Sequence, residues 1–328
     1  MNERTLFYNA ALREALFEEM ERDSSVIVMG EDVARYGGIY RVTEGLQQKF
    51  GPARVRDTAI SEAAIVGAGI GAAIQGLRPV VEIMYADFLP IAMDQIVNQA
   101  STMYFVTGGE ICVPLVIRTQ GGVGFSGGIH HSKNLEAWLT HIPGIKVVAP
   151  ATPYDAKGLL KSAVRDNNPV VFLEHKLLYG TTGPVPEGEY SLLIGRAEVK
   201  RSGRDVTIIA WSRMVLEALV AAEELAEAGI QAEVIDLRTL SPLDEDTIYE
   251  SVRRTNRAIV VHEAWKTSGF GAEIAAWIQE YAFNSLDGPV VRIGGLDTPI
   301  PFSPPLRDSS IPHAADIVKV VKETVRIA

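Results

Sequence analysis

Two side chains in the first half of the sequence carry types and surroundings suited to acid–base chemistry. Glu62 follows Ser61 and opens a run of small and apolar residues, which is typical of a helix start with Ser61 as the N-cap. Burial of such a first-turn carboxylate favours its protonated form, although many first-turn glutamates only complement the helix dipole. His131 follows a glycine-rich stretch, and an imidazole both donates and accepts protons near neutral pH. Phe88 lies between them and by itself reads as a core residue.

A glycine run at Gly67, Gly69 and Gly71 superficially matches a dinucleotide-binding loop. Such a loop must follow a strand and open a helix, whereas these glycines come after Ser61 and Glu62, inside the predicted helix. We therefore interpret them as positions where another helix approaches closely, and not as a nucleotide site.

A serine hydrolase is an alternative from another class of function. Ser126 lies in a Gly-Phe-Ser-Gly-Gly sequence, and Asp236 and His262 follow at the ends of predicted strands, in the order typical of α/β-hydrolases. The preceding strand, however, is expected to end near Arg118, and no helical repeat follows Ser126 directly. The alternative reading is a flexible loop beside an active site.

Cysteine and histidine usage argues against disulfides and transition metals. Cys112 is the only cysteine, so no internal disulfide can form, and a cytoplasmic location is expected. We expect Cys112 itself to be a small core residue, since Ile111 and Val113 flank it. The histidines show no spacing typical of zinc ligands.

Length and charge exclude further classes. The chain has 328 residues and a formal net charge of −10, so nucleic acid is not an expected partner. The longest weakly polar run, residues 63–74, is shorter than the ~20 residues of a membrane span, and no membrane association is expected.

Strand-like and helical segments alternate along the whole chain, which predicts an α/β fold with two domains based on parallel sheets. In the first half, strands are expected near residues 26–29, 54–56, 80–84, 113–118, 145–149 and 170–173, with helices at 12–20, 93–105 and 154–164. Residues 180–195 are rich in Gly and Pro and lack a helical period. We predict domains at 1–185 and 201–328, joined by a linker at 186–200.

Several ordered motifs resemble the β subunit of the thiamine-diphosphate-dependent E1 component of 2-oxo acid dehydrogenase complexes. The resemblance covers essentially the whole chain and includes the pyruvate, branched-chain 2-oxo acid and acetoin dehydrogenases. The matching stretches are Gly-Glu-Asp-Val at 30–33, Arg-Asp-Thr-Ala-Ile-Ser-Glu at 56–62, Asp-Gln-Ile-Val-Asn at 94–98, His-Ser at 131–132, Arg-Asp-Asn-Asn-Pro at 165–169 and Asp-Leu-Arg-Thr-Leu-Ser-Pro at 236–242. The resemblance implies a transketolase-like pyrimidine-binding domain followed by a transketolase-type C-terminal domain.

The resemblance also implies roles for individual residues. Glu62 matches the glutamate that exchanges a proton with a pyrimidine nitrogen of thiamine diphosphate, which activates the coenzyme. Phe88 matches the aromatic residue that stacks on the pyrimidine ring, and Ile60 and Met84 match other residues near that ring. His131 matches a histidine near the substrate that takes part in acyl transfer to the lipoyl group.

The partners follow from the same resemblance. Family α subunits hold the diphosphate through Mg²⁺ with a Gly-Asp-Gly motif, and this chain has no such motif. The resemblance therefore implies an α2β2 heterotetramer that shares thiamine diphosphate, with the lone chain inactive. It also implies docking of the basic subunit-binding domain of E2, the lipoyl acyltransferase, on the acidic C-terminal domain. A structural potassium ion is implied at the positions Leu115, Ala163, Val164, Asp166 and Asn168.

The acyl substrate stays open at this stage. We expect oxidative decarboxylation of a 2-oxo acid, with pyruvate preferred, and a branched-chain 2-oxo acid or acetoin as alternatives. Lys133 departs from the glutamine of many relatives and reads either as a solvated lysine or as a residue near the substrate path. A purely structural assembly subunit is a third class, and it predicts that Glu62 is dispensable for activity.

Overall fold

The computed structural model describes residues 3–326 and divides the chain into two compact units. The first unit contains the chain up to Gly121 together with Trp138–Ile194, and the second contains Gly122–Ala137 together with everything from Gly195 onward. Both units are α/β structures, which confirms the predicted fold class. Within the described residues, every helix is too short or too polar to span a lipid bilayer.

The first unit is built on a parallel sheet with the strand order β6-β7-β5-β4-β2-β3. Its strands are β2 (Val26–Gly30), β3 (Val55–Asp57), β4 (Arg78–Ile83), β5 (Val116–Gly121), β6 (Lys146–Val148) and β7 (Val170–His175). β2 and β5 are buried along their whole length, as expected for a sheet covered on both faces. A separate antiparallel pair joins β1 (Glu3–Phe7) to β8 (Thr182–Pro186).

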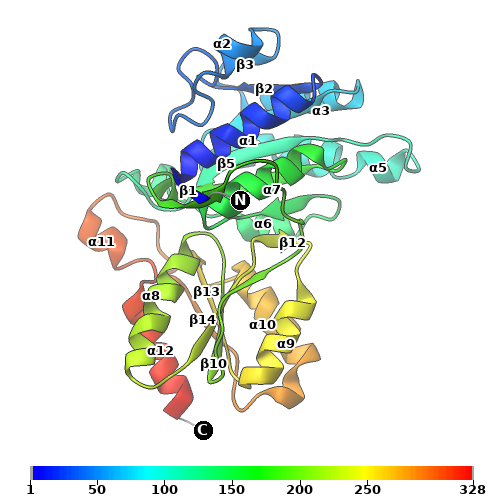
Figure 1. Cartoon of the computed structure of the whole chain (residues 1–328). Helices are drawn as coiled ribbons and strands as arrows, with labels where there is room; N and C mark the ends of the chain where they lie inside the picture. Colours follow the sequence, from blue (N-terminus) through cyan, green and yellow to red (C-terminus); the bar gives the residue numbers. More distant parts are fainter. Residues whose placement is uncertain (1–2, 327–328) are drawn as a thin grey trace. The chain divides into compact units, whose positions relative to one another are not determined.

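Helices of the first unit follow the strands in sequence. They are α1 (Tyr8–Arg22), α2 (Leu46–Phe50), α3 (Glu62–Ile74), α4 (Leu89–Asp94), a π-helical turn η2 (Gln95–Ala100), α5 (Met103–Val106), α6 (Glu136–Thr140), α7 (Pro153–Arg165), and the 3-10 turns η1 (Ala86–Phe88) and η4 (Lys176–Leu178). Helices α1 and α7 lie side by side (Figure 1). The buried Lys157 and Lys161 of α7 both contact Glu18 of α1, so two ammonium groups in this contact are paired with a carboxylate.

The second unit has a sheet in the order β14-β13-β10-β11-β9, with β9 antiparallel to β11. Its strands are β9 (Glu198–Arg201), β10 (Val206–Ala210), β11 (Ala232–Asp236), β13 (Ala258–Trp265) and β14 (Val291–Gly295), with a short strand β12 (Thr239–Ser241) after β11. Its helices are α8 (Arg213–Glu227), α9 (Glu245–Thr255), α10 (Phe270–Tyr281), α11 (Pro304–Asp308) and α12 (Ala314–Arg326), with the 3-10 turns η3 (Gly128–His130) and η5 (Phe283–Ser285). Helices α8 and α12 pack together, while α9 contacts β10 and α10 contacts β13 (Figure 1).

Two local expectations are wrong, at residues 93–105 and at Cys112. Residues 93–105 do not form one helix, because α4 passes into the π-helical turn η2 and the helix restarts only at Met103. Residues 180–195 contain no helix, in keeping with their lack of a helical period, and they include β8, which pairs with the N-terminal strand β1. Cys112 is exposed and not a core residue, because it precedes β5, which begins only at Val116.

The glycine run lies within α3, as predicted, but its neighbours are of two kinds. A Cβ added at Gly67 would lie 3.3 Å from Gln95 of η2, which fits the expected helix contact. A Cβ added at Gly69 would lie 2.8 Å from Val81 of β4 and 3.0 Å from Leu115, so this glycine lets α3 approach the sheet. Nothing lies within 4 Å of the corresponding position at Gly71.

Candidate active site

The strand order of the first sheet defines where a ligand site belongs. From β2 the chain moves outward to β3 and then crosses back to β4 on the other side of β2. In open parallel sheets, such a reversal leaves a crevice at the carboxyl ends of the two strands concerned. Gly30 ends β2 there, and a Cβ on it would lie only 2.9 Å from the carbonyl oxygen of Glu82 in β4. The absence of a side chain at position 30 therefore keeps the two strand ends close together.

Acidic side chains gather at this crevice. Glu62 is the first residue of α3 and only 6% exposed, which confirms its expected place at a helix start. Ser61 occupies the N-cap position, but its side chain makes no capping hydrogen bond. Glu31 follows β2 directly, and burial raises its pKa, with further contributions from the negative charges of Glu62, Asp32 and Glu82. Its Oε1 atom is buried and has no hydrogen-bond partner within residues 3–326.

From the sequence alone, no functional role is predicted for Glu31. The available signal was its position, since an acid directly after a buried parallel strand lies at the edge where ligands bind. The loop that carries it is fixed by Asp57 at the end of β3, whose carboxylate accepts hydrogen bonds from the backbone N–H groups of Ala34 and Arg35. These hydrogen bonds therefore fix the loop after β2 at one side of the crevice.

The apolar residues predicted for the site follow the neighbouring strand or precede α3. Met84 comes directly after β4, and Phe88 ends the 3-10 turn η1; both are half-buried. The N–H of Phe88 donates to the carbonyl of Tyr85 at 2.8 Å, which fixes the turn. Ile60 precedes α3 and is 81% exposed, which is unusual for an isoleucine and leaves it available to a ligand or another chain.

A buried ion cluster lies in the strands that lead to this edge. Arg118 of β5 is fully buried and bonds Glu82 of β4 at 2.5 Å and Glu174 of β7 at 2.6 and 2.8 Å. Burial by itself lowers the pKa of the Arg118 guanidinium, but Glu174 and Glu82 outweigh this and raise the pKa. Burial raises the pKa of Glu174, against the opposing effect of Arg118. The cluster links three neighbouring strands through ion pairs. No short sequence motif predicted it.

His131 belongs to the second unit, in the segment Gly122–Ala137, which we call the histidine loop. A Cβ at Gly127 would lie 2.8 Å from the Cβ of His131, so only a glycine permits this turn. His131 is half-buried, whereas its neighbour His130 is exposed. Lys133 donates from its ammonium group to the carbonyl of Ile129 at 2.6 Å, so it ties the loop together and is more than a solvated charge.

The structure does not support a serine hydrolase triad of Ser126, Asp236 and His262. His262 lies in β13, fully buried, with its ring stacked on Trp211 at 5.4 Å and close to three glycines. Asp236 ends β11, and β10 lies between these two strands. Ser126 lies in the histidine loop, where a 3-10 turn follows it instead of a long helix. The Ser-Asp-His order in the sequence therefore does not correspond to a catalytic triad.

The positions implied for potassium surround one turn of the first unit. The carboxylate of Asp166 accepts from the backbone and side chain of Asn168, each at 2.9 Å, and from Lys146 at 2.5 Å. Arg78 donates to the carbonyl oxygens of Val164 and Asp166. The carbonyls of Ala163 and Leu115 accept from Asp166 and Val170. These oxygens are ligands of the kind that hard cations prefer, and each carbonyl keeps a second lone pair.

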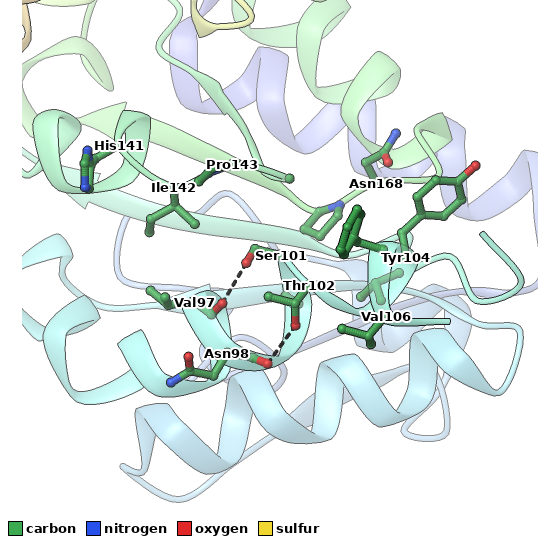
Figure 2. A pocket seen from close by; sticks show the side chains of 15 residues that line it. Val97, Asn98, Ser101, Thr102, Tyr104, Val106, His141, Ile142, Pro143 and Asn168 are labelled. Atoms are coloured by element: carbon green, nitrogen blue, oxygen red, sulfur yellow. Dashed lines mark hydrogen bonds between the residues drawn. The ribbon is translucent and has the colours of Figure 1, made fainter. Parts of the chain in front are cut away.

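A separate pocket lies elsewhere in the first unit (Figure 2). Its volume is about 650 Å³, and its walls are mostly apolar, with Tyr104, Phe105 and Pro143 among them. Val113, Gly144 and Pro169 line it just before β5, β6 and β7 begin, so it lies at the amino ends of the strands. It is therefore on the opposite edge of the sheet from Glu31 and Glu62. Within residues 3–326, no three His, Cys, Asp or Glu side chains are grouped to hold a metal ion.

Comparison with known families and proteins agrees with this architecture. Residues 4–182 match the family "Transketolase, pyrimidine binding domain", and residues 195–317 match "Transketolase, C-terminal domain". A solved structure titled "Split gene transketolase, inactive beta4 tetramer" has the same fold, with a TM-score of 0.80 over 97% of this chain and 98% of the other, at 24% identity.

Curated relatives are similar over nearly their whole length. The pyruvate dehydrogenase E1 component subunit beta of Porphyra purpurea is 49% identical, covering 98% of this chain and 97% of the relative. The acetoin:2,6-dichlorophenolindophenol oxidoreductase subunit beta of Cupriavidus necator is 46% identical, covering 98% of both. E1 components of this kind use thiamine diphosphate. The two-domain architecture and these full-length similarities show that the chain belongs to the family of 2-oxo acid dehydrogenase E1 β subunits.

Proposed function

We propose that this chain, as the β subunit of an α2β2 E1 component, catalyses oxidative decarboxylation of a 2-oxo acid and transfer of the acyl group to lipoamide on E2. The observation that carries the proposal is Glu62, a buried carboxylate at the start of α3, at the reversal point of the first sheet. Pyruvate is the preferred substrate, because relatives named as pyruvate dehydrogenase subunits reach 49% identity. Acetoin is the alternative, because a relative named for acetoin is 46% identical.

The residues at the crevice fit the pyrimidine half of thiamine diphosphate. Glu62 supplies a carboxyl oxygen for a proton shared with a ring nitrogen, and the half-buried Phe88 supplies an aromatic face. The unpartnered Glu31 Oε1 marks a polar atom that the described chain leaves unsatisfied. When bound, the coenzyme supplies a nucleophilic carbon that a protein side chain cannot provide.

The diphosphate half requires another chain. The sequence has no Gly-Asp-Gly motif, and we assign Mg²⁺ and the diphosphate to the α subunit. The exposed Ile60 beside α3 supports this, since a large exposed apolar side chain next to a cofactor site is suited to contact with another subunit. We assign docking of the basic subunit-binding domain of E2 to the second unit; the formal net charge of the whole chain, −10, favours a basic partner.

His131 is assigned to the substrate side of the reaction. A half-buried imidazole on a glycine-rich loop can give a proton to the lipoyl sulfur or the substrate oxygen and take it back. The loop is positioned by contacts within the second unit, among them the hydrogen bonds from Val123 and Asn134 to Glu263.

The turn at 163–168 is proposed to hold a structural potassium ion. Support comes from the kind of oxygen atoms present, since the carbonyls of Leu115, Ala163 and Val164 and the Asp166–Asn168 turn offer the ligands that hard cations prefer. The melting temperature of the protein in KCl should then exceed that in choline chloride of equal ionic strength. Equal melting temperatures in the two salts would remove the assignment.

The decisive test uses Glu62→Gln in the complex with the natural α subunit. The substitution keeps the size of the side chain but removes the exchangeable carboxyl proton, so turnover should fall by about 10²–10⁴-fold, the usual contribution of general acid–base catalysis. Assembly should be retained, as judged by sedimentation. The purified chain without α should show no turnover with pyruvate or acetoin.

Glu110→Gln is the matched control, because Glu110 is an exposed glutamate away from the crevice. Its complex should keep full turnover. If Glu62→Gln also keeps full turnover, the chain acts as a purely structural subunit. Labelling of Ser126 by a fluorophosphonate in the lone chain would instead revive the hydrolase alternative.

A further inference from the structure

A single buried carboxylate in the second unit holds both ends of the histidine loop. Glu263 lies in β13 and is 7% exposed. Its Oε1 atom accepts from the backbone N–H of Val123 at 2.8 Å and from the side-chain amide of Asn134 at 3.2 Å. These two residues are eleven positions apart and lie near the beginning and the end of the loop, with His131 between them.

The charge of Glu263 is balanced inside the same unit. Its Oε2 atom accepts from Arg213 of α8 at 3.1 Å, and Arg213 also pairs with Glu217 at 2.6 Å. Removing the carboxylate would leave a largely buried guanidinium with one partner fewer and would leave the buried N–H of Val123 without its acceptor. The carboxylate therefore links the loop to helix α8 through one ion pair.

Further contacts close the loop. The N–H of Gly122 donates to the carbonyl of Lys133 at 3.2 Å, across the base of the loop. The indole N–H of Trp211 donates to Glu136 at 3.1 Å, and Trp211 is itself held by stacking on His262. The void between the loop and β13 measures only about 10 Å³, which leaves room for about one water molecule.

We propose that Glu263 is a positioning residue for the E1 reaction: it fixes the histidine loop on the second unit and so determines where His131 is presented. The proposal rests on the function proposed above for His131. It assigns to the second unit a part in the chemistry that is separate from any docking role. We expect the contribution of Glu263 to be at the acyl-transfer step, since that is the step assigned to His131.

The test combines a structural and a kinetic measurement on the α2β2 complex. Hydrogen exchange of amides 123–134 should become roughly 10- to 100-fold faster in Glu263→Gln, because charge-assisted bonds that protect the closed loop are weakened. Asn134→Ala removes one of these bonds without uncovering a buried charge, and should give a smaller increase. Reductive acylation of the lipoyl domain should fall more than dye-coupled decarboxylation, in the same direction as for His131→Ala.

Glu233→Gln is the matched control. Glu233 is also a buried acid of the second unit, and it pairs with Arg254, Ser251 and the backbone N–H of Gly203, which all lie outside the loop. It should lower the melting temperature without accelerating exchange at 123–134 or splitting the two activities. Unchanged exchange in both loop variants would overturn the proposal. If His131→Ala proves fully active, the role proposed for His131 is wrong. Faster exchange at 123–134 in Glu263→Gln would still show that Glu263 holds the loop.

Discussion

The candidate site depends on where single charges are allowed to lie. At the crevice, burial raises the pKa of Glu31, and the negative charges of Glu62, Asp32 and Glu82 raise it further. Farther along the strands, Arg118 forms ion pairs with both Glu82 and Glu174. The same chain thus contains carboxylates that are paired with a cation and, in Glu31, a carboxylate whose surroundings are acidic.

A buried histidine provides a prediction at the residue scale. Burial lowers the pKa of His262 to about 4, with Arg292 and Lys266 contributing and the backbone of Ala264 opposing. Because the folded pKa lies below the unfolded value of 6.5, the unfolded chain binds the proton more tightly. Stability is therefore complete above about pH 6.5 and declines as the pH falls toward 4, by about 3 kcal/mol in total.

The measurement is the free energy of unfolding between pH 7.5 and 4 for the wild type and His262→Leu. The variant should be less stable at neutral pH, because the stacking on Trp211 is lost, but its stability should fall less steeply with acid. His141→Gln, at an exposed position, should leave the slope as in the wild type. Parallel curves for the wild type and His262→Leu would contradict the assignment.

At the scale of elements, helix α3 shows how one residue type serves two purposes. Gly69 allows close approach to β4, while Gly71 faces open space in the same helix. The helix begins with Glu62, so its distance from the sheet also sets the depth of the carboxylate. Gly69 therefore affects the position of Glu62 through the packing of α3 on the sheet.

This contrast yields a paired prediction. Gly69→Val should destabilise the protein by about 1–3 kcal/mol or more, because its Cβ would come within 3 Å of Val81 and must displace the helix or the strand. Gly71→Ala should instead stabilise it by about 0.5–1 kcal/mol, since alanine has the higher helix propensity and meets no neighbour. Urea denaturation of both variants is the measurement. Equal effects at the two positions would show that contact with the sheet is not what requires Gly69.

At the scale of the whole molecule, the two units carry different members of the proposed set of site residues. The first unit presents Glu62, Met84 and Phe88 at one sheet edge. The second unit carries His131 on a loop that leaves the first unit after β5 and returns to it within α6. The chain therefore passes between the units twice within twenty residues, so the conformation of this loop depends on contacts with the C-terminal part of the chain.

Much of this arrangement follows from local patterns in the sequence. Alternating apolar strands and amphipathic helices predicted both sheets, and Ser61-Glu62 ahead of an apolar run predicted the start of α3. The ordered motifs indicated the family over the full length of the chain, and the family matches at 4–182 and 195–317 agree with two domains. These features are encoded locally, because strand and helix periods and helix starts depend on neighbouring residues.

Other features depended on contacts between distant residues. The Arg118 cluster joins three strands, and Glu263 reaches residues more than a hundred positions away, so neither could be read from spacing. The exposure of Cys112 and the separation of Asp236 from His262 were likewise decided by where strands end and how they are ordered. The sequence determined the elements and the family, whereas only the tertiary structure decided which charges are paired and which loop the second unit holds, because pairing energy depends on distance and burial.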